Sequence, residues 1–329
     1  MKFVKGQGSS IHDALEQGRK IIKKAKIGQS ELESELILSA AINKPREFIY
    51  THPEFVLSRS EERDFANFIK RRAEHLPLAY ISGFKEFYGL AFFVNKNVLI
   101  PRPETEGLVD LALEEIKKIQ MAGITNIDII DVGTGSGAII ISLIKTLQAD
   151  NYSPSKIFQK NLGGQATNYS LPTTNFYGLD SSKRALTIAQ ENAKRIGVSR
   201  DIQFLRGHLL RPYFQLTKGF RIQDSGFKLI EANLPYLTTS EMKNLQPEVR
   251  YEPRQALDGG KDGLDVYRDF FKQLIKLRNN PFTAICEIAP AQKNGFVKII
   301  KAALPQSETI FLKDLSGRTR FVATKNSPR

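Results

Sequence analysis

A glycine-rich loop between an apolar strand and an apolar helix constrains the fold of this chain more than any other feature. Residues 127–132 read as a strand, Gly133 to Gly137 as the loop, and residues 138–144 as a helix apolar enough to be buried. Glycines let the backbone approach a ligand closely, and the first amides of the helix are free to bind it. From Ile127 onward strands and helices alternate, which predicts an α/β sheet.

The loop alone does not identify its ligand, because its Gly-x-Gly-x-x-Ala spacing is shared with dinucleotide-binding proteins. Asp131 stands two residues before the first glycine, where it can accept a hydrogen bond from the ammonium group of S-adenosylmethionine. This placement favours S-adenosylmethionine. The loop residues expected to bind it are Gly133, Thr134, Gly135, Ser136 and Gly137.

Two later strand ends extend the expected cofactor site. Residues 176–180 read as the second strand, and Asp180 at its end is placed to hold a ribose diol with its carboxylate. His208 and Leu209 follow the next predicted strand and are expected beside the adenine. Together with the glycine loop, these residues form one predicted binding surface for the cofactor.

A polar turn after a further apolar run gives the site its chemistry. Residues 227–230 read as a buried strand, and behind it stand Asn233, Leu234, Pro235 and Tyr236. The Asn233 side chain can orient a planar amide or an exocyclic amine. Pro235 keeps the preceding residue extended, and the Tyr236 ring can cover the bound group. By itself this stretch equally fits a turn that caps a core strand, but with the glycine loop it indicates methyl transfer to a planar nitrogen.

The chain divides into three parts by its sequence pattern. Residues 1–76 have helical spacing, and we interpret them as a small helical domain that docks a partner. Residues 77–100 alternate and contain glycines, which predicts a β-hairpin connector. Residues 101–329 form the predicted cofactor domain. It contains a surface insertion at about residues 148–174, a stretch rich in Asn, Ser, Gln, Gly and Pro.

A stiff segment opens the cofactor domain. The run from Pro101 to Glu106 contains two prolines that favour an extended approach to the helix behind it. Structurally this is a good helix start. Functionally, a stiff segment here can wall the active site, so Arg102 and Glu104 are candidate substrate-binding residues.

Charge and composition restrict the partner and the compartment. The chain has 48 basic and 35 acidic side chains and a net charge of +13, which favours an anionic or RNA-rich partner. A solvated helix face explains the basic cluster from Arg19 to Lys26 equally well. No apolar run approaches the length of a membrane span, and Cys286 lies in an apolar stretch. We therefore expect a cytoplasmic protein without membrane contact. We expect no metal site, since His12, His52 and His75 lack the spacing of metal ligands.

These motifs, taken in order, resemble the HemK/PrmC family of glutamine-N5 methyltransferases, which modify the Gly-Gly-Gln motif of peptide chain release factors. The matching stretches are Gly83 to Phe87, Pro101 to Glu106, Asp131 to Gly137, Asp180, Asn233 to Tyr236, Glu248 to Leu264, Glu287 to Ile288 with Gln292, and Arg318 to Phe321. The resemblance implies a class I methyltransferase dependent on S-adenosylmethionine, with a Rossmann-like seven-stranded sheet and an N-terminal helical bundle. It implies release factors as partners, nucleic acid only indirectly or weakly bound, and a monomer.

The resemblance also assigns roles to particular residues. The expected catalytic residues are Asn233, the backbone carbonyl of Leu234, Pro235 and Tyr236. The Asn233 side chain and the carbonyl would accept both N–H groups of the target amide. No strong base is needed, because the methylated amide is acidic enough to lose its proton to water. Arg250 and Glu252, in the long run from Glu248, are expected to line the substrate channel, unless they form a structural ion pair.

The chain departs from the family pattern at three places. Leu234 replaces the first proline of Asn-Pro-Pro-Tyr, which should make the turn less stiff. His208 stands near the place where the family usually has Asp, which should weaken cofactor binding or make it depend on pH. The insertion contains Gly163-Gly164-Gln165, the substrate motif itself, which we interpret as a coincidence.

Three other functions remain open at this stage. An N6-adenine methyltransferase acting on RNA or DNA shares the catalytic turn but leaves the run from Glu248 to Leu264 unexplained. A catalytically silent homologue that still binds S-adenosylmethionine would follow if Leu234 and His208 abolish turnover. A nicotinamide-dependent dehydrogenase lacks a proton donor at a suitable strand end.

Overall fold

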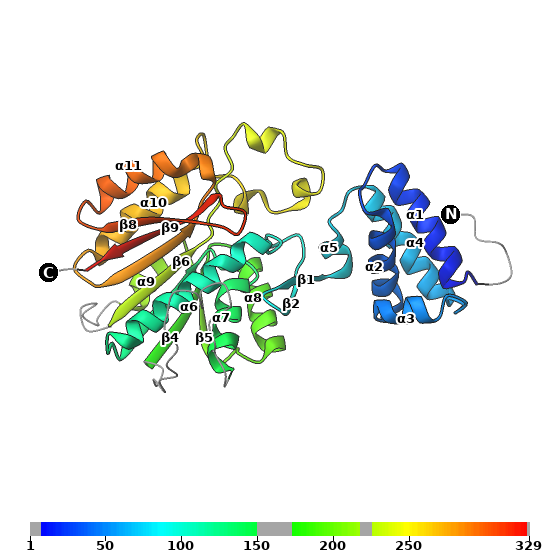
Figure 1. Ribbon diagram of the computed structural model, residues 1–329, viewed down its shortest axis with the longest axis horizontal. Helices are drawn as coiled ribbons and strands as arrows, with labels where there is room; N and C mark the ends of the chain where they lie inside the picture. The colour runs from blue at the N-terminus through cyan, green and yellow to red at the C-terminus, as the bar shows by residue number, and fades with distance from the viewer. Residues whose placement is uncertain (1–7, 150–172, 218–225, 328–329) are drawn as a thin grey trace. The chain divides into compact units, whose positions relative to one another are not determined.

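The computed structural model describes residues 8–149, 173–217 and 226–327 (Figure 1). The chain forms two compact units. The first contains residues 1–84, 94–96 and 245–252, and the second contains residues 85–93, 97–244 and 253–329. Most of the predicted insertion at 148–174, including Gly163-Gly164-Gln165, lies outside the described residues.

The first unit is helical over its described residues. Its helices are α1 (Ile11–Lys24), α2 (Ser30–Ile42), α3 (Arg46–Thr51), α4 (Arg59–Ala73) and α5 (Leu78–Ser82). Their apolar faces meet in one core, which includes Ile22, Leu38 and Phe65. Helix α4 begins with a capping box between Ser58 and Glu61, so the sequence alone marks its start.

A distant stretch of sequence completes this unit. Residues 245–252 contain the short 3-10 helix η4 (Val249–Tyr251) and pack with α4 and the residues after it. The guanidinium of Arg72 donates to Glu248 Oε1 at 3.3 Å, and the Tyr251 hydroxyl donates to the carbonyl of Glu74 at 2.6 Å. The long run that supported the family resemblance is therefore divided between the two units.

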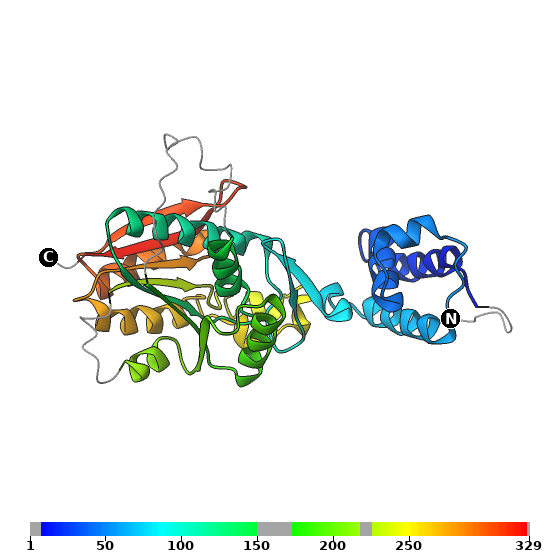
Figure 2. The same ribbon diagram turned by 90° about the horizontal axis from the view of Figure 1, so that it is seen from below.

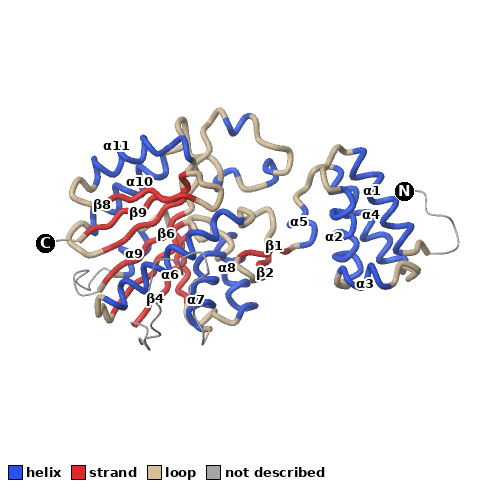
Figure 3. Tube along the Cα trace, viewed as in Figure 1, coloured by secondary structure: helices blue, strands red, loops and turns tan. Residues whose placement is uncertain are grey.

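In the described part of the second unit, a seven-stranded sheet has the order β5-β4-β3-β6-β7-β9-β8. Its strands are β3 (Asn126–Val132), β4 (Thr173–Asp180), β5 (Ile202–Arg206), β6 (Phe227–Ala232), β7 (Phe282–Glu287), β8 (Glu308–Lys313) and β9 (Thr319–Asn326). Neighbours from β5 to β7 are parallel, whereas β9 is antiparallel to β7 and β8. The strands are drawn in red in Figure 3. This is the predicted seven-stranded α/β fold.

Helices cover both faces of the sheet, as Figure 2 shows for α6 and α10. One face carries α6 (Glu106–Met121), α7 (Ala138–Gln148) and α8 (Lys183–Ile196), and the other carries α9 (Arg211–Leu216), α10 (Asp265–Leu274) and α11 (Lys293–Ala303). The central strands are apolar on both sides because both are covered. None of the helices in the described ranges is long and apolar enough to cross a membrane.

The predicted connector at residues 77–100 contains a helix as well as a hairpin, since α5 precedes β1 (Phe84–Phe87) and β2 (Leu90–Phe93). The fully buried Asn192 of α8 fastens β2 to the glycine loop. Its side-chain oxygen accepts from the Phe93 amide at 2.7 Å. Its amide nitrogen donates to the carbonyls of Phe93 and Ser136, at 3.0 and 2.9 Å. One side chain thus links the hairpin, a helix and the loop.

Replacing Asn192 with Ala should destabilise the second unit, because three hydrogen bonds in a buried place are lost together. We expect a cost of about 2–4 kcal/mol, seen as a lower unfolding temperature in calorimetry. The exposed Gln190→Ala on the same helix is the matched control and should change the transition little. Equal transitions in both variants would show that Asn192 has no such role.

Candidate active site

The candidate site lies where the parallel strands end. Asp131 is next to last in β3, Asp180 ends β4, Asn233 follows β6 and Glu287 ends β7. The chain runs outward from β3 through β4 to β5 and then returns to β6 on the other side of β3. Such a reversal opens a crevice at the carboxyl ends of the strands, where α/β sheets bind ligands. The topology therefore brings the glycine loop and the polar turn to the same edge.

The glycine loop is closed against the neighbouring strand. The amides of Gly133 and Thr134 both donate to the carbonyl of Leu179, at 2.8 and 2.9 Å. Gly133, Gly135 and Gly137 have φ angles of 78°, 56° and 80°, in the left-handed region that side chains rarely adopt. The loop can take this shape only with glycines. A Cβ at Gly133 would meet Leu234 and one at Gly137 would meet Ile141, whereas a Cβ at Gly135 would meet only the Gly133 carbonyl, at 3.8 Å, so the backbone is most open at Gly135.

Asp131 lies beneath this loop, since its side chain is fully buried. Its Oδ2 accepts a hydrogen bond from the Thr134 hydroxyl at 2.6 Å. Burial, with a further contribution from the charge of Asp180, raises the pKa of Asp131 to about 7. Asp131 Oδ1 has no hydrogen-bond partner among the described residues, and the contact of Asp131 with a ligand's ammonium group stays a prediction.

Asp180 holds the loop from the side of β4. Its Oδ2 accepts from the Gly135 amide at 3.0 Å, and its Oδ1 accepts from the Ser182 amide at 2.8 Å. Burial raises the pKa of Asp180, and these backbone amides oppose the shift. A carboxylate oxygen accepts more than one hydrogen bond, so Asp180 retains capacity for a diol.

His208 and Leu209 lie in the turn after β5. The His208 side chain is exposed, and its Nε2 is 3.8 Å from Asp269 Oδ2. Leu209 is buried with a φ of 53°. A left-handed conformation in a leucine is uncommon and costly, so the turn is held by its surroundings.

The Asn233 amide is held by two acceptors. Its Nδ2 donates to Glu287 Oε2 and to Thr105 Oγ1, both at 3.0 Å. The Thr105 hydroxyl in turn donates to Glu287 Oε2 at 2.7 Å, and the Tyr236 hydroxyl donates to Glu287 Oε1 at 3.4 Å. Burial raises the pKa of Glu287, while the Thr105 hydroxyl and the positive charge of Arg320 oppose the shift.

This arrangement fixes which atom Asn233 offers to a ligand. Three donors point at the Glu287 carboxylate, so it acts as an acceptor and holds the amide nitrogen of Asn233. Turning the amide over would place its oxygen against the carboxylate. The Asn233 Oδ1 is therefore the free face of the side chain, with no hydrogen bond from any described residue. It can accept an N–H of a planar amide.

Leu234 is held by a second buried group, the hydroxyl of Tyr267 on α10. That hydroxyl accepts from the Leu234 amide at 3.2 Å and donates to the carbonyl of Glu287. A hydroxyl has one hydrogen, so its donation to Glu287 leaves the more distant Leu234 carbonyl, at 3.5 Å, able to accept elsewhere. Here the leucine retains an N–H that a proline would lack.

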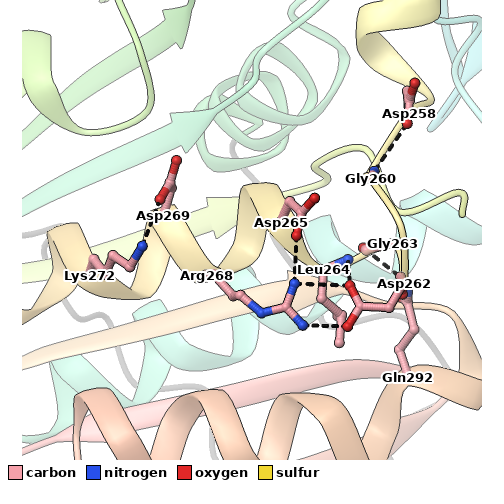
Figure 4. A network of polar contacts seen from close by, with 10 residues as sticks. All are labelled: Asp258, Gly260, Asp262, Gly263, Leu264, Asp265, Arg268, Asp269, Lys272 and Gln292. Atoms are coloured by element: carbon pink, nitrogen blue, oxygen red, sulfur yellow. Dashed lines mark hydrogen bonds and ion pairs between the residues drawn. The ribbon is translucent and has the colours of Figure 1, made fainter. Parts of the chain in front are cut away.

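A loop from Asp258 to Asp265 carries a network of polar contacts (Figure 4). Asp262 accepts a hydrogen bond from the Leu264 amide and is paired with Arg268. The Gln292 side chain donates to the carbonyl of Tyr236 at 2.8 Å and to that of Gly263 at 3.1 Å. A Cβ on Gly263 would lie 2.2 Å from the Tyr236 carbonyl, so only glycine allows this approach.

The predicted substrate-binding residues fall in both units. Arg102 and Glu104 flank the start of the 3-10 helix η1 (Pro103–Thr105), whose last residue bonds Asn233 and Glu287. The charge of Arg102 acts on the Tyr236 hydroxyl, and that of Glu104 acts on Glu287. Burial and the charge of Glu287 raise the pKa of Tyr236 to about 12, so its hydroxyl stays protonated.

Arg250 and Glu252 belong to the first unit, whereas Asn233 belongs to the second. Arg250 Nε donates to the carbonyl of Leu245 at 3.1 Å, and Glu252 is buried. No ion pair between them is present in the described part of the chain. Neither is there a group of His, Cys, Asp and Glu side chains that could hold a metal ion.

The sequence patterns do not single out Thr105, Glu287 or Tyr267 as site residues. Glu287 ends an apolar run, as Asp131 and Asp180 do, so the same signal was present for it. Thr105 and Tyr267 carry no local signal, because their positions depend on how α6 and α10 pack.

The comparisons with known proteins agree with this geometry. The family model for the PrmC N-terminal domain matches residues 13–83. The release factor glutamine methyltransferase of Bacillus cereus is 30% identical over 313 residues, which cover 95% of this chain and 98% of that protein. The release factor glutamine methyltransferase of Dictyoglomus turgidum is 34% identical over 88% of this chain and 89% of its own.

Solved structures with a related fold are more distant. The N-terminal domain of human METTL16 in complex with SAH has a TM-score of 0.46 and 13% identity, and the likeness covers 88% of this chain and 93% of that one. A likeness at this level has no weight for function.

Replacing Tyr267 with Phe should loosen the polar turn, because the Leu234 amide and the Glu287 carbonyl lose their shared buried partner. We expect a loss of about 1–3 kcal/mol, measured as a lower unfolding temperature. Tyr177→Phe is the control, since the Tyr177 hydroxyl makes no hydrogen bond to a described residue. The claim fails if the two variants unfold at the same temperature.

Proposed function

This chain belongs to the family of release factor glutamine methyltransferases, and we propose that its substrate is the glutamine of the Gly-Gly-Gln motif of peptide chain release factors. The methyl group would pass from S-adenosylmethionine to the side-chain amide nitrogen, N5. The observation that supports this most directly is the fixed amide of Asn233, which presents its oxygen and not its nitrogen.

Two acceptors suit the two hydrogens of a primary amide. The Asn233 Oδ1 is one, and the carbonyl of Leu234 is the other. The nitrogen of an amide is a poor nucleophile because its lone pair is delocalised into the carbonyl. Accepting both N–H groups orients that nitrogen and stabilises the positive charge that grows on it. Tyr236 would cover the glutamine side chain from one side.

The cofactor surface supports the proposal in the same way. The backbone of the loop is most open at Gly135, which fits a ligand that approaches closely, and the Asp180 carboxylate fits a ribose diol. Thr134, Ser136, His208 and Leu209 complete the proposed cofactor residues. S-adenosylmethionine would supply an electrophilic methyl group on its sulfonium. The chain's own residues position the acceptor and need no strong base, because the methylated amide loses its proton readily to water.

The first unit is proposed to dock the release factor, and the segment with Arg250 and Glu252 would take part because it is built into that unit. The basic residues of α1, among them Arg19, Lys20, Lys23 and Lys24, would attract an acidic surface of the partner. Arg102 and Glu104 would line the way to Asn233. A release factor substrate implies a cytoplasmic enzyme, and we propose that it acts as a monomer with little direct contact with nucleic acid.

The function is tested by incubating the protein with methyl-labelled S-adenosylmethionine and purified release factors, with and without their Gly-Gly-Gln glutamine replaced. Label should appear only on the intact motif. Label on RNA or DNA instead would support adenine methylation. Binding of the cofactor without label on any of these substrates would indicate a silent homologue.

Asn233→Ala should lower the turnover number by about 100-fold or more, because one of two acceptors for the target amide is lost. Cofactor affinity, measured by calorimetry, should change little. Asn244→Ala, an exposed asparagine outside the cluster, is the control. Unchanged turnover in Asn233→Ala would exclude this mechanism.

Glu287→Gln should lower the turnover number by about 10- to 100-fold, because a glutamine can also donate and no longer fixes the Asn233 amide. In the unchanged protein, protonation of Glu287 has the same effect. Since burial raises the pKa of Glu287, activity should be present above that pKa and fall as the pH drops through it, above the ordinary value of 4.5. The variant should lose this acidic limb.

A matched control for that variant is Glu115→Gln. Glu115 is also buried and bonded to a threonine, Thr283, at the other end of β7. It should affect stability but leave the pH profile of turnover in place. A Glu287→Gln enzyme with the unchanged profile would rule out the clamp.

A further inference from the structure

Two carboxyl groups lie side by side beneath the glycine loop. Asp131 of β3 and Glu231 of β6 are partners in the parallel register, so their side chains are on the same face of the sheet. Both are 0% exposed. Glu231 is not among the cofactor or substrate residues proposed above.

The pair is short of hydrogen-bond donors. Both carboxyl oxygens of Glu231 and the Oδ1 of Asp131 are buried without a partner in the described part of the chain. The Thr134 hydroxyl serves only the remaining oxygen, Asp131 Oδ2. Buried carboxylates are expensive unless paired with a cation or with donors, and two of them side by side cannot both be ionised.

Among the residues that the structure describes, the elements around the pair offer no compensating cation. Gly178 of β4 is opposite Asp131, and Ile285 of β7 is opposite Glu231. Helix α6 contributes apolar side chains to this face. Asp180 is the other charged group that acts on Asp131, and because it is also negative it raises the pKa of Asp131 further. The Ile140 amide of α7 lowers that pKa by a smaller amount.

Glu287, the next acid along this edge, is taken up by Thr105 and Asn233. Burial and the mutual repulsion of the two acids raise the pKa of Glu231 well above its ordinary value. At neutral pH Glu231 therefore keeps its proton, and Asp131, whose pKa is about 7, is protonated in part of the molecules, so that the pair can lose one proton and keep the other.

We infer that Glu231 couples cofactor binding to proton release: when the positively charged methyl donor binds at the glycine loop, the Asp131–Glu231 pair loses a proton to solvent. The inference rests on the proposed function, since it takes S-adenosylmethionine as the ligand. The carboxylate that remains faces the added positive charge across a medium of low polarity, where such an attraction is strong. S-adenosylhomocysteine, which has a neutral thioether in place of the sulfonium, should release much less.

This coupling affects which of the two ligands the site prefers. The pair would favour the charged donor over the neutral product, and the preference would grow as the pH rises. Glu231 would act as a positioning residue for charge, without touching substrate or cofactor.

The test is isothermal titration calorimetry of the full chain at neutral pH in buffers of different ionisation enthalpy, which counts the protons released. With S-adenosylmethionine we expect up to about one proton, and clearly fewer with S-adenosylhomocysteine. In Glu231→Gln the new amide can donate to Asp131, which should stay ionised, so that proton release is largely lost. Glu231→Leu, of similar volume, shows whether the change in proton release comes from the loss of the carboxyl group or from the new amide.

Asp128→Asn is the matched control, because Asp128 is a buried acid of the same strand on the opposite face, with Asn175 and Tyr213 as partners. It should leave the number of released protons unchanged.

A second readout uses the protein without ligand. A buried acid with a raised pKa stabilises the folded state least at high pH, so stability is lost as the pH rises above the ordinary value of 4.5. Glu231→Gln should therefore raise the unfolding temperature more in alkaline than in acidic buffer, by about 5 °C. An equal shift at all pH values would contradict the proposal.

The outcomes separate this inference from the proposed function. Binding of S-adenosylmethionine with no proton release, or with the same release in Glu231→Gln, overturns the inference and leaves the methyltransferase function intact. No binding of either ligand overturns both.

Discussion

Glu287 ends β7 with a carboxylate that accepts hydrogen bonds from Thr105, which precedes α6, and from Asn233 and Tyr236 of the turn after β6. The geometry of the catalytic turn depends on this one buried acceptor. A carboxamide has two similar ends, and only its surroundings decide which end meets the substrate. By placing an acceptor behind Asn233, the fold makes the residue an acceptor in front. Arg320 of β9 and the hydrogen bonds compensate the buried charge.

The turn is also fixed from behind by segments that follow it in the sequence. Tyr267 of α10 binds the Leu234 amide, and Gln292 joins the carbonyls of Tyr236 and Gly263. Such contacts lower the freedom of the turn before any ligand arrives, which is how an active site is preorganised. The same edge of the sheet also holds Asp131 and Glu231, of whose four carboxyl oxygens only Asp131 Oδ2 accepts a hydrogen bond in the described part of the chain. The site thus combines one acid that has several hydrogen-bond donors with a pair of acids that has few.

The sequence predicted what depends on local pattern and left out what depends on packing. The α/β sheet, the glycine loop and the polar turn all follow from apolar runs with glycine or asparagine at their ends, whereas the prediction of seven strands came from the family resemblance. The depth of Asp131 does not, since a carboxylate before a glycine loop can face a ligand or lie beneath it. Thr105 reaches Glu287 across 182 positions, a contact that only the sheet order and the packing of α6 create. Arg250 belongs to the first unit although the chain on both sides of residues 245–252 belongs to the second, and its local sequence does not predict this.

The hydrogen bond between Leu234 and Tyr267 links two positions that are far apart in the sequence. A proline at 234 would stiffen the turn by its ring and leave the Tyr267 hydroxyl without a donor, whereas a leucine needs that hydroxyl to hold its amide. The two positions should therefore change together among related chains: a ring at the first, or a hydroxyl at the second. In related chains that have neither the proline ring nor the tyrosine hydroxyl, we expect the turn to be no longer fixed.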